Sequence, residues 1–284
     1  MAVFSNQATL TYNGVSTNSN IAYGEILDVL SATKAPVESS YTQGETVTYT
    51  VALRNTGGNQ LNNLTVTDDL GAYQFGTTTV YPLTYVTNSV LYYVNGVLQA
   101  APVVTAEQPL TITGINIPAN GDAVIVYQAV ANSFANPEVG GVITNTATVT
   151  GDGLSAPVVA TANVDAATAA LLSISKTITP NQVVDNDRVT YTFIIQNAGN
   201  EAVTATDDAV ITDTFDPILT ALTVTLNGAT LAEGTDYTYN AATGLFQTAN
   251  GTITVPAATY TVDPVTGEYT LTPGISTLIV TGTI

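Results

Sequence analysis

Two stretches of this chain repeat one another, and this repeat constrains the fold more than any other feature. The matching pairs are residues 30–34 with 172–176 and residues 47–55 with 189–197. In both copies a lysine precedes a tyrosine by 15 residues, Lys34 before Tyr49 and Lys176 before Tyr191. A fixed spacing of this kind is typical of tandem copies of one structural unit. The chain has 284 residues, enough for two units that each bury a core.

The residue pattern predicts strands. Val, Ile, Leu, Ala and Tyr are set among many Thr residues, which suits half-buried pleated surfaces, and no segment has apolar residues at helical spacing over several turns. Short alternating runs are separated by turn signals such as Gly57-Gly58-Asn59. We therefore expect an all-β chain that contains two β-sandwiches in tandem.

The repeat also predicts where the domains lie. The expected segments are an N-terminal strand at 1–14, a linker at 15–29, the first sandwich at 30–153, an Ala-, Val- and Thr-rich connector at 154–171 and the second sandwich at 172–284. Residues 277–284 align with residues 123–130, after which the first sandwich has a further strand at 142–150. The second sandwich has no counterpart of that strand, so we expect it to lack its closing strand and to leave a sheet edge open.

The amino-acid composition excludes most kinds of catalytic and ligand-binding chemistry. The chain has no Cys and no His, so it lacks disulfides, thiolate ligands and the usual general base. Its 22 acidic and 4 basic residues give a formal charge of -18, which repels nucleic acid and anionic lipid. The acidic residues at 207–216 do not form a calcium loop with regularly spaced oxygen ligands. We expect no enzyme, cofactor, metal site, nucleic-acid partner or membrane insertion, and at most a single-turnover crosslinking of the chain itself.

The N-terminal strand repeats an internal segment. Residues 5–14 resemble residues 144–153, and Asn6 takes the place of Asn145. Residues two apart in a strand share a face, so the N-terminal strand has one amphipathic face that carries an asparagine. The residues of this face are Asn6, Ala8, Leu10 and Tyr12.

The same parity places five polar residues on the apolar face of their strands. They are Lys34, Asp68 and Asn145 in the first sandwich and Lys176 and Asp213 in the second. An unpaired buried charge is costly, so an inward lysine must be neutral, paired or covalently consumed. The only two lysines of the chain hold equivalent positions, each with an equivalent aspartate.

Two short patterns resemble those of known surface proteins. The run Lys-...-Val-Thr-Tyr-Thr-...-Asn-x-Gly and the closing Asn-x-Ala-Thr-Val resemble the conserved repeat domain of many bacterial surface proteins. The Lys/Asp/Asn set is similar to that of isopeptide-forming pilin and adhesin domains. This resemblance implies an immunoglobulin-like sandwich in which a lysine on the first strand joins an asparagine on the last, assisted by a carboxyl group.

For the first sandwich, the resemblance implies a bond between Lys34 and Asn145, with Asp68 as the proton relay. Burial lowers the pKa of a lysine and raises that of a carboxyl group, which gives a nucleophilic amine beside an acid that polarises the amide. Holding amine and amide together supplies roughly 7–11 kcal/mol of the barrier. The product is an amide, with loss of ammonia. The alternative is an ion pair at the edge of the core with a hydrogen-bonded asparagine nearby.

The second sandwich has Lys176 and Asp213 but no asparagine on a closing strand. The N-terminal strand of another copy would supply both by donor-strand addition, and Asn6 would then bond to Lys176 of the neighbouring copy. Because donor and acceptor surfaces differ, this contact propagates head to tail. Three alternatives stay open: a frayed N-terminus, a strand that folds back within its own chain, and a fragment of a longer repeat array.

The sequence therefore predicts a self-assembling fibre or pilus subunit in an extracellular location, on a cell or spore surface. Its partner is a further copy of the same chain, and a host or surface ligand is unknown. A second interpretation is a stalk or adhesin module that has only intrachain bonds and a ligand-binding face. The weakest interpretation is a catalytic accessory domain.

Overall fold

The computed structural model describes residues 2–26 and 28–284. Residues 1 and 27, which fall in the expected N-terminal strand and linker, lie outside the described residues. The described chain consists of β-strands with a single short 3-10 helix, η1 (Ala205–Asp207), so the all-β prediction is confirmed. The chain divides into unit 1, Met1–Asn136 with Gly141–Ala166, and unit 2, Pro137–Gly140 with Ala167–Ile284.

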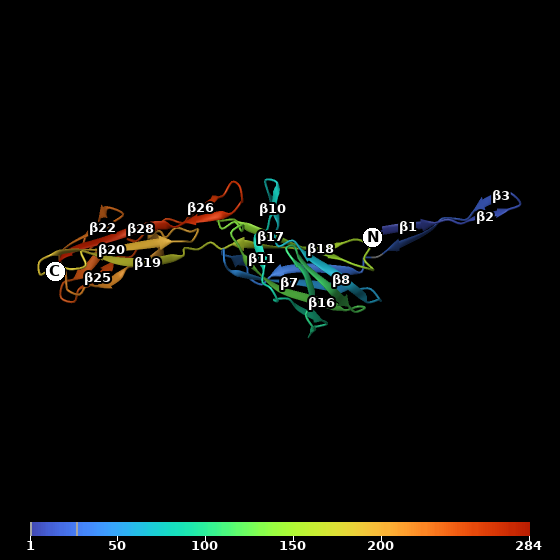
Figure 1. The fold of residues 1–284 in the computed structure, drawn as a ribbon, viewed down its shortest axis with the longest axis horizontal. Helices are drawn as coiled ribbons and strands as arrows, with labels where there is room; N and C mark the ends of the chain where they lie inside the picture. The colour runs from blue at the N-terminus through green and yellow to red at the C-terminus, as the bar shows by residue number, and fades with distance from the viewer. Residues whose placement is uncertain (1, 27) are drawn as a thin grey trace. The chain divides into compact units, whose positions relative to one another are not determined.

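Unit 1 contains two six-stranded sheets and a small hairpin (Figure 1). The first sheet has the order β13 (Val97–Leu98), β12 (Leu91–Val94), β16 (Asp122–Ala131), β7 (Thr46–Asn55) and β5 (Leu30–Pro36), with β11 (Leu83–Tyr85) also paired to β16. The second has the order β14 (Val103–Glu107), β15 (Leu110–Ile117), β8 (Leu61–Asp68), β17 (Val142–Thr150), β18 (Val158–Ala166) and β6 (Ser40–Tyr41). The hairpin is β9 (Tyr73–Phe75) with β10 (Thr78–Val80).

The two sheets of unit 1 enclose a single core because their strands alternate. In β7, every second side chain from Val47 to Leu53 is buried while the residues between them face outward. The strands β8, β15, β16 and β17 follow the same alternation, with inward Val, Ile, Leu, Ala and Tyr residues. This period of two fits a two-layer sandwich.

Unit 2 repeats one sheet of this arrangement and only part of the other. Its larger sheet has the order β19 (Leu172–Thr179), β20 (Arg188–Asn197), β28 (Gly274–Thr283), β22 (Thr220–Leu226) and β23 (Ala229–Thr230). Its smaller sheet has the order β21 (Thr212–Thr214), β25 (Leu245–Thr248) and β24 (Tyr237–Asn240), beside a separate hairpin of β26 (Thr259–Val262) and β27 (Tyr269–Thr272). The core between the sheets is centred on Phe193, Phe215 and Phe246.

The order β8–β15–β14 in unit 1 corresponds to β21–β25–β24 in unit 2. In unit 1 the free side of β8 is taken by β17, which in turn pairs with β18. Within the described residues, β21 pairs with β25 and has no second neighbour. The described residues of unit 2 thus contain no counterpart of β17 or of β18.

The N-terminal residues form a hairpin of two successive ladders, drawn in blue in Figure 1. Strand β1 (Ala2–Asn6) pairs with β4 (Ala22–Ile26), and β2 (Thr9–Tyr12) pairs with β3 (Val15–Asn18). The turn is Asn13-Gly14, and both residues have positive φ, 49° and 79°. Two positive φ values in a two-residue loop are the requirement of a type I′ turn, which Asn-Gly satisfies well.

The structure corrects three expectations. The expected linker at 15–29 holds β3 and β4, so the N-terminal element is a hairpin and not one strand. The expected connector at 154–171 holds the buried strand β18. Its inward side chains Ala160, Ala162 and Val164 are small, and a sequence of such small residues resembles that of a linker. The alignment of residues 277–284 with residues 123–130 is wrong by one residue. Val280 of β28 lies opposite Tyr191 of β20, and Tyr127 of β16 lies opposite Tyr49 of β7, so Val280 corresponds to Tyr127.

Candidate functional site

Lys34 lies in the core of unit 1. It sits in β5 opposite Val51 of β7, and its side chain is 0% exposed. Its Nζ donates to Asp68 Oδ2 at 2.6 Å. The amine also lies over the rings of Tyr49 and Tyr127, 5.0 and 6.0 Å from their centroids. The parity of β5 therefore places the lysine where the sequence predicts it, in an enclosed aromatic and acidic pocket.

Asp68 is the last residue of β8 and is fixed through both carboxylate oxygens. Its Oδ1 accepts from the backbone N–H of Leu70 at 3.0 Å. Its Oδ2 accepts from Lys34 and also from the hydroxyl of Tyr127, each at 2.6 Å. Burial raises the pKa of Asp68 and lowers the pKa of Lys34, although the charge of each partner opposes the shift. Burial thus favours transfer of the lysine proton to the carboxylate.

Asn145 is fully buried in β17 and completes the cluster. Its Nδ2 donates to the Tyr127 hydroxyl at 3.0 Å. Its Oδ1 is buried and has no hydrogen-bond partner among the described residues. An unsatisfied buried amide oxygen costs about 1–3 kcal/mol in an ordinary core. The amide is held by its nitrogen, and its carbonyl is left free for another donor.

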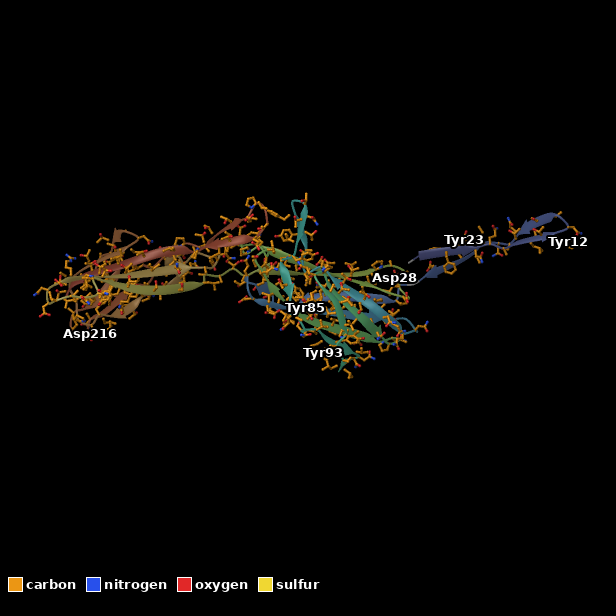
Figure 2. The ribbon with its side chains drawn as sticks, viewed as in Figure 1. Tyr12, Tyr23, Asp28, Tyr85, Tyr93 and Asp216 are labelled. Carbon is orange, nitrogen blue, oxygen red and sulfur yellow. The ribbon has the colours of Figure 1, made fainter. Side chains whose placement is uncertain are left out.

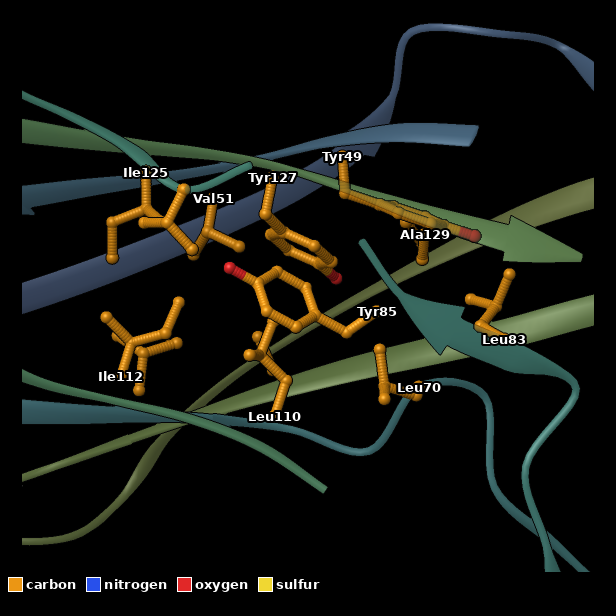
Figure 3. Close-up of a cluster of buried hydrophobic side chains, with 14 of the residues drawn as sticks. Tyr49, Val51, Leu70, Leu83, Tyr85, Leu110, Ile112, Ile125, Tyr127 and Ala129 are labelled. Atoms are coloured by element: carbon orange, nitrogen blue, oxygen red, sulfur yellow. The ribbon is translucent and has the colours of Figure 1, made fainter. Parts of the chain in front are cut away.

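The structure adds two tyrosines that the sequence analysis did not single out. Tyr49 of β7 and Tyr127 of β16 are direct register partners, and their rings stack at a centroid distance of 5.6 Å (Figure 3). Tyr127 is 1% exposed, and its parity with Ile125 and Ala129 is the signal that would have placed it in the core. The hydroxyl of Tyr127 connects Asp68 to Asn145 and joins the site into one hydrogen-bonded chain.

Unit 2 holds half of the same site. Lys176 of β19 donates to Asp213 of β21 and lies over the rings of Tyr191, Phe193 and Phe215. Its side chain is 38% exposed, whereas that of Lys34 is 0% exposed. Within the described part of unit 2, the strand that would carry a counterpart of Asn145 is absent.

The inward face of β19 is uncovered. Every residue of this strand is exposed, including Leu172 at 47% and Ile174 at 56%. In unit 1 the equivalent strand β5 is packed against β18, and Leu30 is buried. The exposed lysine and the exposed apolar face of unit 2 therefore have one structural cause, the missing counterparts of β17 and β18.

Asn6 lies on the exposed strand β1, opposite Ala22 of β4. The predicted donor residues Asn6, Ala8, Leu10 and Tyr12 are all exposed in the N-terminal hairpin. Strands β1 and β2 pair with β4 and β3, and with no strand of unit 2 among the described residues. Tyr12, at 74% exposure, and Tyr23, at 73%, project from the hairpin (Figure 2). The structure thus brings Lys34, Asp68 and Asn145 together and pairs Lys176 with Asp213, but it leaves Asn6 alone.

The cluster in unit 1 has the groups that amide transfer needs. It brings together a buried amine, a carboxyl group with a raised pKa and an amide carbonyl. In amide transfer, groups of these three types can act as nucleophile, proton acceptor and electrophile. Among residues 2–26 and 28–284, the one helix is η1, and no helix has the length and hydropathy to cross a bilayer.

The fold and this site define an all-β protein of sandwich units that carry lysine–aspartate pairs. No family model and no curated protein matches the chain. Similar solved structures include the pilus backbone RrgB of Streptococcus pneumoniae, with 12% identity over 86% of this chain and 55% of that chain and a TM-score of 0.34. A C-terminal fragment of the major pilin GBS80 of Streptococcus agalactiae has 13% identity over 87% of this chain and 91% of that chain, with a TM-score of 0.34.

An adhesin domain is also among the similar structures. The collagen-binding domain of a Staphylococcus aureus adhesin has 13% identity over 49% of this chain and 99% of that chain, with a TM-score of 0.31. The structural neighbours thus include pilin and adhesin domains, together with two glycoside hydrolases and a bacterial hydrophobin.

Proposed function

We propose that this chain is the subunit of an extracellular fibre that grows head to tail. The N-terminal hairpin of one copy would enter unit 2 of the next, and isopeptide bonds would lock the polymer. We place the fibre on a cell or spore surface, with no enzymatic role beyond forming its own crosslinks. Its partner is a second copy of the chain.

The observation that carries this proposal is the uncovered side of unit 2. Strand β21 presents a free edge, and β19 presents apolar side chains and a lysine to solvent. Natural sheets protect such edges, and a contiguous apolar face on a soluble unit marks a binding surface. In unit 1 the same surfaces are covered by a pair of strands, β17 and β18. The missing occupant of unit 2 should therefore be a pair of strands.

The N-terminal hairpin has the form of that occupant. Gly14 follows Asn6 by eight residues, as Gly153 follows Asn145, and in each case a second strand returns after the turn. The hairpin exposes apolar side chains that a core would bury, among them Phe4 at 57% and Leu10 at 67%. A lone two-stranded hairpin is marginally stable in water, so it can rearrange into a sheet at low cost.

In the proposed complex, the first strand of the donor pairs with β21 and its second strand covers β19. This is the arrangement of β17 beside β8 and of β18 against β5 in unit 1. It would bring Asn6 to the Lys176–Asp213 pair of the neighbouring copy. Covering the lysine would remove it from water, as Lys34 is removed from water in unit 1.

Two crosslinks follow from the proposal. Lys34 and Asn145 would form a bond within unit 1, with Asp68 as the proton relay. Lys176 and Asn6 would form a bond between copies, with Asp213 in the same role. Each bond links Nζ to the side-chain carbonyl carbon of the asparagine and releases one ammonia, a loss of about 17 Da.

Electrophoresis after boiling in SDS tests the polymer. The proposal predicts a ladder of covalent multimers that is lost in Asn6→Ala and in Lys176→Ala. Asn145→Ala is the matched control, because it removes the intrachain bond and should leave the ladder in place. A single monomer band from wild-type chains that have lost about 17 Da once would instead favour a stalk or adhesin module with only the intrachain bond.

A further inference from the structure

The hydroxyl of Tyr127 occupies a position that the proposed crosslink requires and that the lysine, aspartate and asparagine do not fill. It donates to Asp68 Oδ2 at 2.6 Å and accepts from Asn145 Nδ2 at 3.0 Å. Asp68 Oδ2 is also the atom that accepts from Lys34 Nζ. One continuous path of hydrogen bonds therefore runs from the attacking nitrogen, through a single carboxylate oxygen and a phenol, to the nitrogen that must leave.

The leaving nitrogen needs a proton, and the Tyr127 hydroxyl lies within hydrogen-bond distance of it, at 3.0 Å. Lys34 first gives a proton to Asp68, and its neutral amine adds to the side-chain carbonyl carbon of Asn145. The former amide nitrogen is then a tetrahedral amine with a lone pair, so it can accept a proton and depart as ammonia. Two hydrogen bonds, with the Tyr127 hydroxyl between them, connect Asp68 to that nitrogen.

We infer that Tyr127 is a catalytic residue that relays a proton from Asp68 to the leaving nitrogen of Asn145. The inference rests on the proposed Lys34–Asn145 bond. In this step the phenol gives its proton to Nδ2 and takes one from the Asp68 carboxyl group, while the carbon–nitrogen bond to Nδ2 breaks. The new amide nitrogen then loses its extra proton to Asp68. The site ends with one amide, one ammonia and a protonated carboxyl group, so atoms and charge balance.

The surroundings of Tyr127 suit a relay. Burial raises the pKa of its hydroxyl, and the negative charge of Asp68 raises it further, so the phenol keeps its proton between steps. The ring is clamped by stacking on Tyr49, whose own hydroxyl is buried and has no hydrogen-bond partner among the described residues. The titratable groups that act on the cluster are Lys34, Asp68, Asp69, Glu38, Tyr41, Tyr49 and Tyr127.

The relay distinguishes the two lysine sites. Val280 of unit 2 holds the register position of Tyr127, opposite Tyr191, the counterpart of Tyr49. No hydroxyl lies at that position, so the proposed bond at Lys176 would have to use Asp213 without this phenol. Tyr127 would therefore affect the rate of the Lys34–Asn145 bond and not that of the Lys176–Asn6 bond.

The test measures the rate of ammonia loss in the wild-type chain and in two variants. Full-length protein is synthesised in a cell-free reaction, quenched at intervals in acid denaturant, and weighed intact. Tyr127→Phe should slow the loss of about 17 Da by about 100-fold, within the range of general acid–base effects. Tyr85→Phe is the matched control, because it also removes a buried tyrosine hydroxyl, one without a hydrogen bond among the described residues, and should leave the rate unchanged.

A second measurement separates relay from folding. Trifluorotyrosine at position 127 keeps the ring and the hydroxyl but makes the phenol more acidic, so a relay predicts a changed rate and a shifted pH profile. A purely structural phenol predicts neither. Bond formation at the wild-type rate in Tyr127→Phe, or a rate indifferent to fluorination, would overturn the inference. Wild-type chains that never lose ammonia in unit 1 would show instead that the proposed bond itself is wrong.

Discussion

The two lysines have the same sequence context and opposite environments. Lys34 is enclosed with Asp68, whereas the Lys176–Asp213 pair is open to solvent on one side. A buried charge pair that loses one member leaves an uncompensated charge in the core. A partly exposed ion pair contributes little to stability.

From this contrast we predict unequal effects of two alanine substitutions. Measured in the Asn145→Ala background, in which the proposed bond does not form, Lys34→Ala should lower the free energy of unfolding of unit 1 by about 3–5 kcal/mol, because Asp68 is left buried without its cation. Lys176→Ala should change unit 2 of the free monomer by at most about 1 kcal/mol. Urea titration followed by tyrosine fluorescence measures both, and equal losses would contradict the environments described here.

The pH dependence of the intrachain bond is a second prediction at the residue scale. The reaction needs the Lys34–Asp68 pair to share a single titratable proton. At low pH both the amine and the carboxyl group are protonated, and at high pH both are deprotonated. The rate of bond formation should therefore fall on both sides of an optimum pH. Burial lowers the pKa of Lys34 from 10.5 and raises that of Asp68 from 3.8. The profile should therefore differ from that of a free lysine and a free aspartate, with the Lys34 pKa displaced to lower pH and the Asp68 pKa displaced to higher pH.

Timed intact-mass measurements across pH give this profile. Rates that rise without limit toward high pH would indicate a free exposed amine as the nucleophile. That result would contradict the buried pair.

Strand parity predicts much of the unit 1 site. A period of two is enough to turn Lys34, Asp68 and Asn145 inward, and the structure buries all three. Tyr127 is harder to predict from the sequence. The sequence alignment of β28 with β16 is wrong by one residue, and it therefore does not match Tyr127 with Val280. The orientation of its hydroxyl depends on three strands that meet only in the fold.

At the scale of elements, the sequence pattern finds strands where apolar residues alternate and misses them elsewhere. Strand β18 is buried through alanines, β3 is mostly polar (Val-Ser-Thr-Asn), and the apolar residues of β4 (Ala-Tyr-Gly-Glu-Ile) are interrupted by Gly and Glu. The pairing of these strands depends on their neighbours and turns. Strand β18 lies between β17 and β6, and the Asn13-Gly14 turn brings the strands of the N-terminal hairpin together. The Asn-Gly turn is a local signal that predicts the hairpin when it is weighed together with the residues that follow it.

The hairpin form of the donor is testable with peptides. A peptide of residues 2–26 should block fibre growth by filling unit 2, because it supplies a strand for β21 and a cover for β19. A peptide of residues 2–14 should block about tenfold less well, since one missing covering strand leaves apolar area worth roughly 1.4 kcal/mol or more in water. Light scattering during assembly reports the inhibition.

A third peptide serves as the control in that assay. A scrambled peptide of residues 2–26 should have no effect. Equal inhibition by residues 2–14 and residues 2–26 would show that the donor is a single strand.

At the scale of the whole molecule, charge opposes self-association. Each copy carries a formal charge of -18, while the segment 2–26 contains Glu25 as its single charged residue. The donor is thus nearly neutral, but the bodies that it joins repel one another. Salt screens this repulsion, with a Debye length of about 8 Å at 0.15 M.

We predict that fibre growth accelerates as salt rises from about 0.01 to about 0.15 M. An uncharged osmolyte at the same osmolality is the control and should have a smaller effect on the initial rate of light scattering. Slower growth in salt would mean that charge attraction drives assembly, contrary to the composition of the chain.

The most direct test of a covalent head-to-tail fibre is isotope mixing. Chains labelled with ¹⁴N and with ¹⁵N are mixed as monomers, allowed to assemble, boiled in SDS, digested and mapped by mass spectrometry. The account predicts a crosslinked peptide pair that joins Lys176 to Asn6, with half of the pairs carrying one label of each kind when the chains are mixed equally. Crosslinks between Lys176 and Asn6 that never combine labels, or boiled material that contains only monomer, would contradict it.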